Sequence, residues 1–266
     1  MKKTNLLKLL LVIPLGLGLL LLSACNKKDN NGGITGSITD IDGNTYKTIV
    51  EHLEALGYHI KSKVLNTCKV TTVPQNCERI YIVCFKERAT FDRFSFDGRS
   101  MPVCEPIKSF LMNDADVPEK YYYTAKRTTI YDRLKNAVTE PITDTGGAVY
   151  QYRKHYVCKN KSGVCPTLTA NMGTGEHNVP IVMDQRGIRK LTPRECFNLQ
   201  GFPKDYVLPH LPDSKLYCLA GNAVSIPVVS LIARRIVDVL LHTRSYNTIH
   251  LSLNTHFNPS FMPIKV

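Results

Sequence analysis

The chain has 266 residues and a formal net charge of +12, because 34 Lys and Arg outnumber 22 Asp and Glu. Its 43% hydrophobic residues are typical of a globular protein and exclude a disordered or fibrous chain. The nine cysteines include no Cys-x-x-Cys pair and are too sparse for a small disulfide scaffold, and we expect no metal site. The positive charge indicates an anionic partner, either nucleic acid or an acidic membrane surface.

Three features follow one another in residues 1–25. Three lysines precede an uncharged apolar run at 9–22, which is followed by Ser23, Ala24 and Cys25. The apolar run is shorter than the roughly 20 residues that a membrane span needs. The segment resembles a bacterial lipoprotein signal peptide, in which diacylglycerol is attached to the cysteine thiol and the chain is cut before it. The resemblance implies a membrane anchor at Cys25; the alternative is a buried N-terminal helix with an incidental cysteine.

Residues 26–44 are polar and rich in glycine, which predicts a flexible tether. At its end, Asp42-Gly43-Asn44 lies between β-favouring residues and predicts a hairpin turn. The stretch 38–48 resembles the opening of a repeated surface-lipoprotein domain, which fits the preceding leader.

A helix and two strands are predicted next. Residues 45–58 carry apolar side chains at helical spacing, and Gly57 is expected to end this helix. Residues 63–65 predict a short strand, and the β-branched and aromatic run 79–85 predicts a buried one. This order of elements predicts a mixed α/β fold.

Three blocks of sequence stand in a fixed order along the chain. The first is Val73-Pro74-Gln75 with Arg79, the second runs from Arg189 through Leu199-Gln200-Gly201-Phe202-Pro203, and the third is Ala220-Gly221-Asn222-Ala223-Val224 with Ile226-Pro227-Val228. Together they resemble the C-terminal half of DNA cytosine-5 methyltransferases over roughly residues 45–240.

The resemblance implies a fold, a reaction and a set of boundaries. The implied fold is part of the S-adenosylmethionine-dependent methyltransferase fold, at 45–85 and 205–240, plus a small, mostly β or irregular target recognition domain at 86–204. The implied reaction transfers a methyl group from S-adenosyl-L-methionine to C5 of cytosine in double-stranded DNA, as in restriction–modification systems. The residues at 241–266 match no part of the family and are expected to be a disordered tail.

The resemblance also implies site residues. Gln75 and Arg79 are expected to support catalysis, and Asn222, Ala223 and Val224 are expected to lie at the cofactor.

The insert at 86–187 is the part expected to contact DNA. Its residues 120–161 hold nine Lys or Arg and three acids, together with seven tyrosines. Basic residues interleaved with aromatic ones fit a surface that follows phosphates and contacts bases, whereas the alternative is a solvated basic face over core tyrosines. With the Thr-Leu pair that the family resemblance adds, the predicted DNA-binding residues are Lys126, Arg127, Arg153, Lys154, Thr167 and Leu168.

Several motifs that the reaction needs do not occur in these 266 residues. The family's nucleophile lies in a Pro-Cys loop, its supporting glutamate in Glu-Asn-Val, and its cofactor on Phe-x-Gly-x-Gly, and none of the three is found. Cys77 also stands where the family has an arginine. We therefore expect no activity from this chain alone. The alternatives are the DNA-recognition half of a split enzyme, with a separate N-terminal half as partner, and a membrane-anchored lipoprotein with vestigial similarity. The leader places the chain at a membrane, and a leader acquired by fusion would leave it in the cytoplasm.

Two helix starts are readable from local chemistry. Thr192, Pro193 and Glu195 predict a capping box. Ser225 is expected to cap the final helix, with Pro227 in its first turn.

Overall fold

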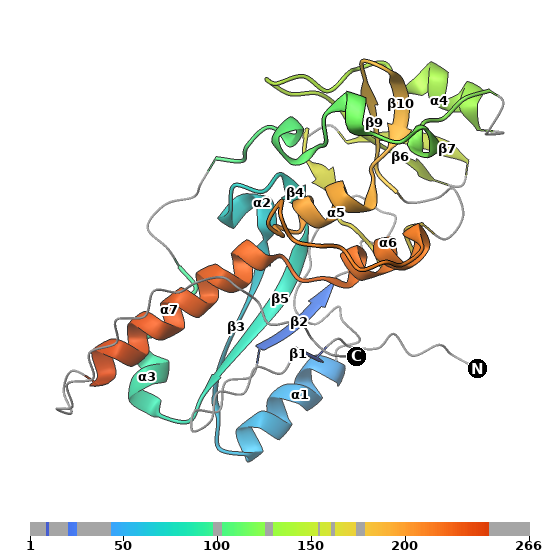
Figure 1. Ribbon diagram of the computed structural model, residues 1–266. Coiled ribbons are helices and arrows are strands. Elements are labelled where there is room, and N and C mark those ends of the chain that lie inside the picture. The colour runs from blue at the N-terminus through green and yellow to red at the C-terminus, as the bar shows by residue number, and fades with distance from the viewer. Residues whose placement is uncertain are drawn as a thin grey trace.

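The computed structural model describes residues 9–10, 21–25, 44–97, 103–125, 130–153, 155–160, 163–173 and 179–244. These residues form two parts that lie side by side, with helices and a sheet in each (Figure 1). The predicted mixed α/β fold is confirmed.

The first part is a sheet with helices on both faces. Its strands are antiparallel in the order β1 (Leu9–Leu10), β2 (Leu21–Cys25), β5 (Glu78–Phe85) and β3 (His59–Asn66). Helix α1 (Asn44–Ala55) covers one face, and α3 (Arg88–Arg93) and α7 (Ile226–Arg244) cover the other (Figure 1).

Strand β5 is buried on both faces because its side chains alternate between two apolar clusters. Ile80 and Ile82 pack with Leu53 of α1, whereas Tyr81 and Val83 pack on the side of α7. This explains the nearly continuous run of apolar residues and confirms the predicted buried strand.

Helix α1 begins at Asn44, so the residues after the predicted hairpin turn are helical rather than extended. The hairpin prediction is wrong for this flank, because Ile49 and Leu53 share a helical face that packs against β5. The predicted end of the helix is confirmed, since Gly57 has a φ of 77° and its N–H donates to the Glu54 carbonyl oxygen at 2.8 Å. Residues 26–43 of the predicted tether lie outside the described residues.

The end of the predicted leader contributes backbone to the first sheet. Strand β2 pairs with β5 so that Leu22 lies opposite Ile82 and Cys25 opposite Arg79. Most of the first 25 residues lie outside the described part of the chain, and lipidation of Cys25 stays a prediction.

The second part is built on another antiparallel sheet and on irregular structure. The sheet has the order β10 (Gly187–Lys190), β9 (Ile181–Asp184), β6 (Val149–Arg153) and β7 (Tyr156–Asn160). The connecting segments contain three short 3₁₀ helices and one α-helix: η2 (Ile107–Phe110), η3 (Asp114–Asp116), η4 (Glu119–Tyr121) and α4 (Tyr131–Ala137).

Packing divides the chain differently from the predicted boundaries. Residues 88–96 pack with β5 and α7, although the prediction gave them to the recognition domain. Helix α6 (Asp213–Asn222) packs instead with α5 (Pro193–Leu199) in the core of the second part. Helix α7 runs to Arg244, so the predicted disordered tail begins as helix; residues 245–266 lie outside the described residues.

Helix α7 lies in a long apolar stretch of the described chain. The stretch Asp213–Leu241 is long and apolar enough to cross a membrane by length and composition. Val228, Ile232 and Ile236 are nevertheless buried against the first sheet, which identifies α7 as a core helix of the folded part.

Candidate functional site

The first sequence block lies directly beside the Thr-Leu region, Thr167 and Leu168, of the second part. Strand β4 (Gln75–Asn76) pairs in parallel with β8 (Cys165–Pro166). The Thr167 hydroxyl donates to the Asn76 carbonyl oxygen at 2.7 Å. These bonds join residues about ninety positions apart and hold the two segments together.

The third block packs closely against the same region at Gly221. A Cβ atom at Gly221 would lie 2.2 Å from the backbone carbonyl carbon and oxygen of Thr169. Because real Cβ atoms do not approach so closely, only glycine lets α6 lie against the segment 165–170.

The second block is bonded to the third. The Gln200 side chain donates from Nε2 to the Ala220 carbonyl oxygen at 2.8 Å, and the Ile226 N–H donates to the Gln200 carbonyl oxygen at 3.0 Å. Gly201, with a φ of 82°, lies against the ring of Pro227. All three blocks and the Thr-Leu region therefore meet at one place between the two parts.

Arg79 links the first block to the third across 144 positions of the chain. Its Nη2 donates to the Ala223 carbonyl oxygen at 2.8 Å, and the side chain is buried. Gln75 is also buried, and neither polar atom of its amide has a hydrogen-bond partner among the described residues. An unsatisfied buried amide costs about 1 to 3 kcal/mol, so Gln75 lowers the stability of this region.

The predicted cofactor residues lie at the end of α6. Asn222, Ala223 and Val224 are half-buried, and the Asn222 side-chain Nδ2 contacts the Cys218 Sγ at 3.4 Å. They form an accessible turn next to Arg79.

Three of the predicted DNA-binding residues, Lys126, Arg127 and Lys154, lie outside the described residues. Arg153 is exposed at the end of β6, and its guanidinium donates to the Gln151 side-chain oxygen at 3.1 Å.

The Thr-Leu pair has structural contacts instead. The Thr167 hydroxyl is used in the bond to Asn76. Leu168 is 1% exposed and belongs to the core of the second part, so its side chain is not accessible to DNA.

Five of the seven tyrosines of the segment 120–161 are core residues, and the base-contacting interpretation is wrong for these five. Tyr156 is 59% exposed and Tyr131 is half-buried. The other five are buried: Tyr121, Tyr122, Tyr123, Tyr150 and Tyr152. Tyr150 and Tyr152 point inward because every second side chain of β6 faces the core.

Several basic side chains of this segment have acidic or hydroxyl partners. Lys120 lies 2.7 Å from the Asp213 carboxylate, Lys159 pairs with Glu140, and Arg133 donates to the Tyr152 hydroxyl at 3.2 Å. These pairs reduce the number of cations that are available to phosphates.

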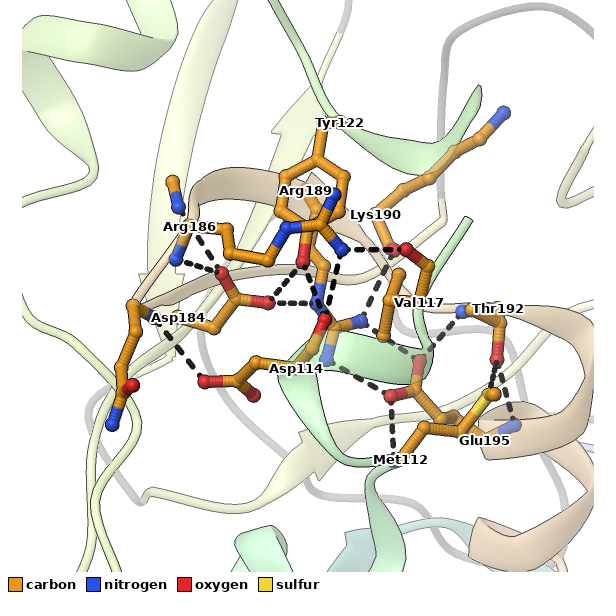
Figure 2. Close-up of polar contacts among 12 residues, drawn as sticks. Met112, Asp114, Val117, Tyr122, Asp184, Arg186, Arg189, Lys190, Thr192 and Glu195 are labelled. Atoms are coloured by element: carbon orange, nitrogen blue, oxygen red, sulfur yellow. Dashed lines mark hydrogen bonds and ion pairs between the residues drawn. The ribbon is translucent and has the colours of Figure 1, made fainter. Parts of the chain in front are cut away.

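A buried ionic cluster stabilises the second part next to the site. Figure 2 shows the Arg189 guanidinium between two carboxylates, with Asp184 Oδ2 at 2.5 Å from Nε and both Glu195 oxygens at 2.9 Å from Nη1 and Nη2. The Arg189 side chain is 0% exposed, and the carboxylates raise its pKa although burial acts to lower it. A charge buried this deeply is stable only when it is fully paired.

Backbone and hydroxyl donors complete both carboxylates of this cluster. Asp184 accepts from the Tyr122 hydroxyl at 2.8 Å, and burial together with this bond raises the pKa of the tyrosine. Glu195 accepts from the N–H groups of Met112 at 3.0 Å and Thr192 at 2.7 Å (Figure 2). The cluster thus joins β9, β10, α5 and the segment before η3. Sequence reasoning missed it, because Asp184 and Arg189 are brought together only by the β9–β10 turn.

The predicted capping box of α5 is confirmed. The Thr192 hydroxyl accepts from the Glu195 N–H at 3.2 Å, and the Glu195 carboxylate accepts from the Thr192 N–H. The Ser225 cap is wrong, because the Ser225 hydroxyl is buried and has no partner among the described residues.

The fold matches solved methyltransferases. The chain superposes on an Entamoeba histolytica methyltransferase, EhMeth, with a TM-score of 0.53 at 16% identity, over 73% of this chain and 58% of that one. The Dnmt2 methyltransferase of S. pombe gives a TM-score of 0.51 at 15% identity, over 73% of this chain and 62% of that one. The fold class is therefore that of S-adenosylmethionine-dependent methyltransferases.

The family follows from the sequence itself. Residues 34–238 match the family described as C-5 cytosine-specific DNA methylase, and the chain belongs to this family. It is 47% identical over 200 residues to the type II methyltransferase M.Bsp6I of Bacillus sp. (strain RFL6), covering 75% of this chain and 62% of that protein. It is 34% identical to the type II methyltransferase M.HaeII of Haemophilus aegyptius, covering 81% of this chain and 63% of that protein. The chain thus spans less than two thirds of the length of these relatives.

The residues present do not make a full cofactor site. Of the residues predicted to lie at the cofactor, Asn222 and the turn after it are half-buried, and the turn is bonded to Arg79 through the Ala223 carbonyl oxygen. A shallow cavity of about 480 Å³ lies elsewhere, between β3 and the segment after α3, and is lined by Lys61, Lys63 and Arg93 among others.

Proposed function

We propose that this chain is the DNA-recognition and cofactor-side part of a cytosine-5 DNA methyltransferase of the restriction–modification type. The contacts that join the three sequence blocks to the segment 165–170 carry the proposal, because they form one continuous surface where the two parts meet. In this proposal the buried Arg79 and Gln75 support the catalytic side from behind, and the half-buried Asn222 lies at S-adenosylmethionine.

Methyl transfer requires groups that these 266 residues do not contain. A cysteine thiolate must attack C6 of the cytosine, and the family's Pro-Cys loop is not in the sequence. The target base must also leave the duplex and enter a closed pocket. Chemistry therefore requires a nucleophile and a glycine-rich cofactor loop that come from residues outside these 266.

A methyl-transfer assay tests this assignment. The purified chain, incubated with tritiated S-adenosylmethionine and duplex DNA, is expected to incorporate no label. The matched control is the same chain mixed with residues that carry the missing motifs from a close relative such as M.Bsp6I, where label should appear in cytosine. Incorporation by the chain alone would overturn the proposal, and failure of the mixture together with absent DNA binding would remove its support.

We propose weak, phosphate-directed binding of duplex DNA by the recognition part. The net charge of +12 supports it, as does the exposed Arg153 beside Lys154. The paired cations and the buried tyrosines leave few groups to read bases, so we expect affinity in the nonspecific range, roughly 10⁻⁴ to 10⁻⁶ M at physiological salt.

A salt titration tests DNA binding. Replacing Lys126 and Arg127 by Ala is expected to weaken binding to all sequences alike and to flatten the salt slope by up to about two units. Replacing Lys47 and Arg88, which are exposed on the first part, is the matched control and should change neither. Tight, salt-insensitive binding to one short sequence would contradict the phosphate-directed mode.

A second proposal concerns the leader: if it is used, Cys25 is lipidated and the chain is held at a membrane. The pattern of residues 1–25 supports this. Cleavage before Cys25 would remove Leu21–Ala24 from β2, so the mature chain would lose that strand from the first sheet.

Metabolic labelling tests the leader. Labelled palmitate should enter the expressed chain, and Cys25→Ala should abolish the label, whereas Cys158→Ala should not. Unlabelled protein that retains Met1 would refute lipidation and assign the chain to the cytoplasm.

A further inference from the structure

Two half-exposed cysteines lie where the chain crosses from the first part to the second. Cys68 belongs to α2 (Thr67–Val70), and Cys104 lies in the segment that leads to η2. The Cys104 thiol donates to the Cys68 carbonyl oxygen at 2.9 Å, and the Cys68 thiol donates to the Asn66 side-chain oxygen at 3.2 Å. The crossing is held in place nearby, where the Glu105 N–H donates to the Thr72 carbonyl oxygen at 2.8 Å.

We propose that Cys68 and Cys104 form a reversible disulfide when the protein meets a hydroperoxide. The Cys68 thiolate attacks the peroxide, the O–O bond breaks, and a sulfenic acid forms as one hydroxide leaves. The Cys104 thiol then attacks the Cys68 sulfur, the S–S bond forms, and the second oxygen leaves as water after taking up the thiol proton. One hydrogen peroxide is reduced to two waters, and two thiols are oxidised to one disulfide.

The surroundings assign the two roles. Burial raises the pKa of both thiols, so they are protonated at neutral pH and the reaction is faster in alkaline solution. For Cys68 the positive charge of the neighbouring Lys69 opposes this effect of burial on the pKa, and we assign the first attack to Cys68.

A second adjacent pair shows why access decides the outcome. Cys165 and Cys196 also lie near each other, but both are 0% exposed. Burial raises the pKa of each and keeps peroxide away from both sulfurs. Cys68 and Cys104 combine proximity with partial exposure, which the buried pair lacks.

The disulfide would fix the loop that carries the first sequence block. The Cys104 sulfur also approaches the carbonyl oxygens of Thr71, at 4.0 Å, and Val73, at 3.8 Å, so the bond would close the chain directly beside Gln75. The closed loop spans 36 positions, and closing a loop of this length restricts the unfolded chain strongly. This inference does not depend on the proposed methyltransferase function.

The test is oxidation of the full chain by hydrogen peroxide in mildly alkaline buffer. Remaining thiols are then blocked, and peptides are mapped by mass before and after reduction. We expect a Cys68–Cys104 peptide as the main linked species, reversed by dithiothreitol. The melting temperature of the oxidised chain should rise by about 5 to 10 °C.

Substitutions separate the pair from the other thiols. Cys104→Ser and Cys68→Ser should each abolish both the linked peptide and the rise in melting temperature. Cys158→Ser, in the half-exposed strand β7, is the matched control and should leave both unchanged. Full alkylation of Cys68 and Cys104 after oxidation, a dominant Cys165–Cys196 peptide, or stable sulfinic acid at Cys68 would each overturn the proposal.

Discussion

The two parts of the molecule are held together by different interactions. The first part is a sheet between helices, and its core is apolar: β5 packs on α1 through one face and on α7 through the other. The second part has shorter main strands and many irregular segments, and beside its apolar core it holds the buried ion cluster of Asp184, Arg189 and Glu195.

This difference follows from what each part must join. Regular strands satisfy their own backbone groups, so apolar side chains are enough to fill the space between sheet and helix. The 3₁₀ turns around Met112 present backbone N–H groups from which a carboxylate can accept a hydrogen bond. The Glu195 carboxylate accepts from the Met112 N–H. The ionic cluster therefore specifies one arrangement of irregular chain, and the apolar core stabilises a regular one.

The largest expected effect comes from breaking the ion cluster. Arg189→Met should lower the free energy of unfolding by about 3 to 5 kcal/mol, because Asp184 and Glu195 would stay buried without their cation. Urea denaturation followed by circular dichroism measures it.

Two further variants sharpen this test. Arg88→Met removes an exposed pair with Asp92 and should cost less than about 1 kcal/mol. Replacing Asp184 and Glu195 together with Arg189 by apolar residues should cost less than Arg189→Met alone, since no charge is left buried. A cost of Arg189→Met no greater than that of Arg88→Met would show that the cluster is solvated in solution.

The next largest effect is expected in the apolar core of the first part. Ile232→Ala should lower the free energy of unfolding by about 2 to 4 kcal/mol, since Ile232 is buried against β5 and a cavity would remain. Val237→Ala on the same helix is the matched control; this side chain is 50% exposed and should change the free energy by about 0.5 kcal/mol at most. Equal costs for the two variants would mean that α7 does not pack on the sheet as described.

The comparison also explains what the sequence could and could not predict. Strand β5, helix α1 and the capping box of α5 were predictable because each depends on neighbours along the chain. The burial of Tyr150 and the inaccessibility of Leu168 depend on which segments pack over them, and composition carries no such signal.

The candidate site shows the same division. The three blocks were recognisable from sequence, whereas the bond of Arg79 to Ala223 and the approach of α6 to Thr169 join segments far apart in the chain. Local propensity also predicted a helix cap at Ser225. Its hydroxyl is buried and has no hydrogen-bond partner among the described residues.

A smaller effect is expected where the blocks meet. Gly221→Ala should lower the free energy of unfolding by about 1 to 3 kcal/mol, because its Cβ would lie 2.2 Å from the Thr169 backbone and α6 would have to move. Protection of the amides at 165–170 from hydrogen exchange should fall in the same variant. Leu219→Ala, which removes an exposed side chain from the same helix, should leave both quantities unchanged. Unaltered exchange in Gly221→Ala would contradict the close packing of the blocks.

The smallest expected effect tests how the ion cluster and the helix cap share Glu195. Thr192→Ala removes the hydroxyl that accepts from the Glu195 N–H and should cost about 1 kcal/mol, the usual cost of losing a helix cap. The Glu195 carboxylate would keep its bonds to Arg189 and to the Thr192 N–H, since the latter comes from the backbone. Thr192→Ser restores the hydroxyl and should recover most of the loss. In a double variant with Arg189→Met, the two costs should fail to add, because both side chains bond directly to Glu195, Thr192 at its N–H and Arg189 at its carboxylate. Additive costs would show that the cap and the cluster act independently, and the second part would then resemble the first more closely than its structure indicates.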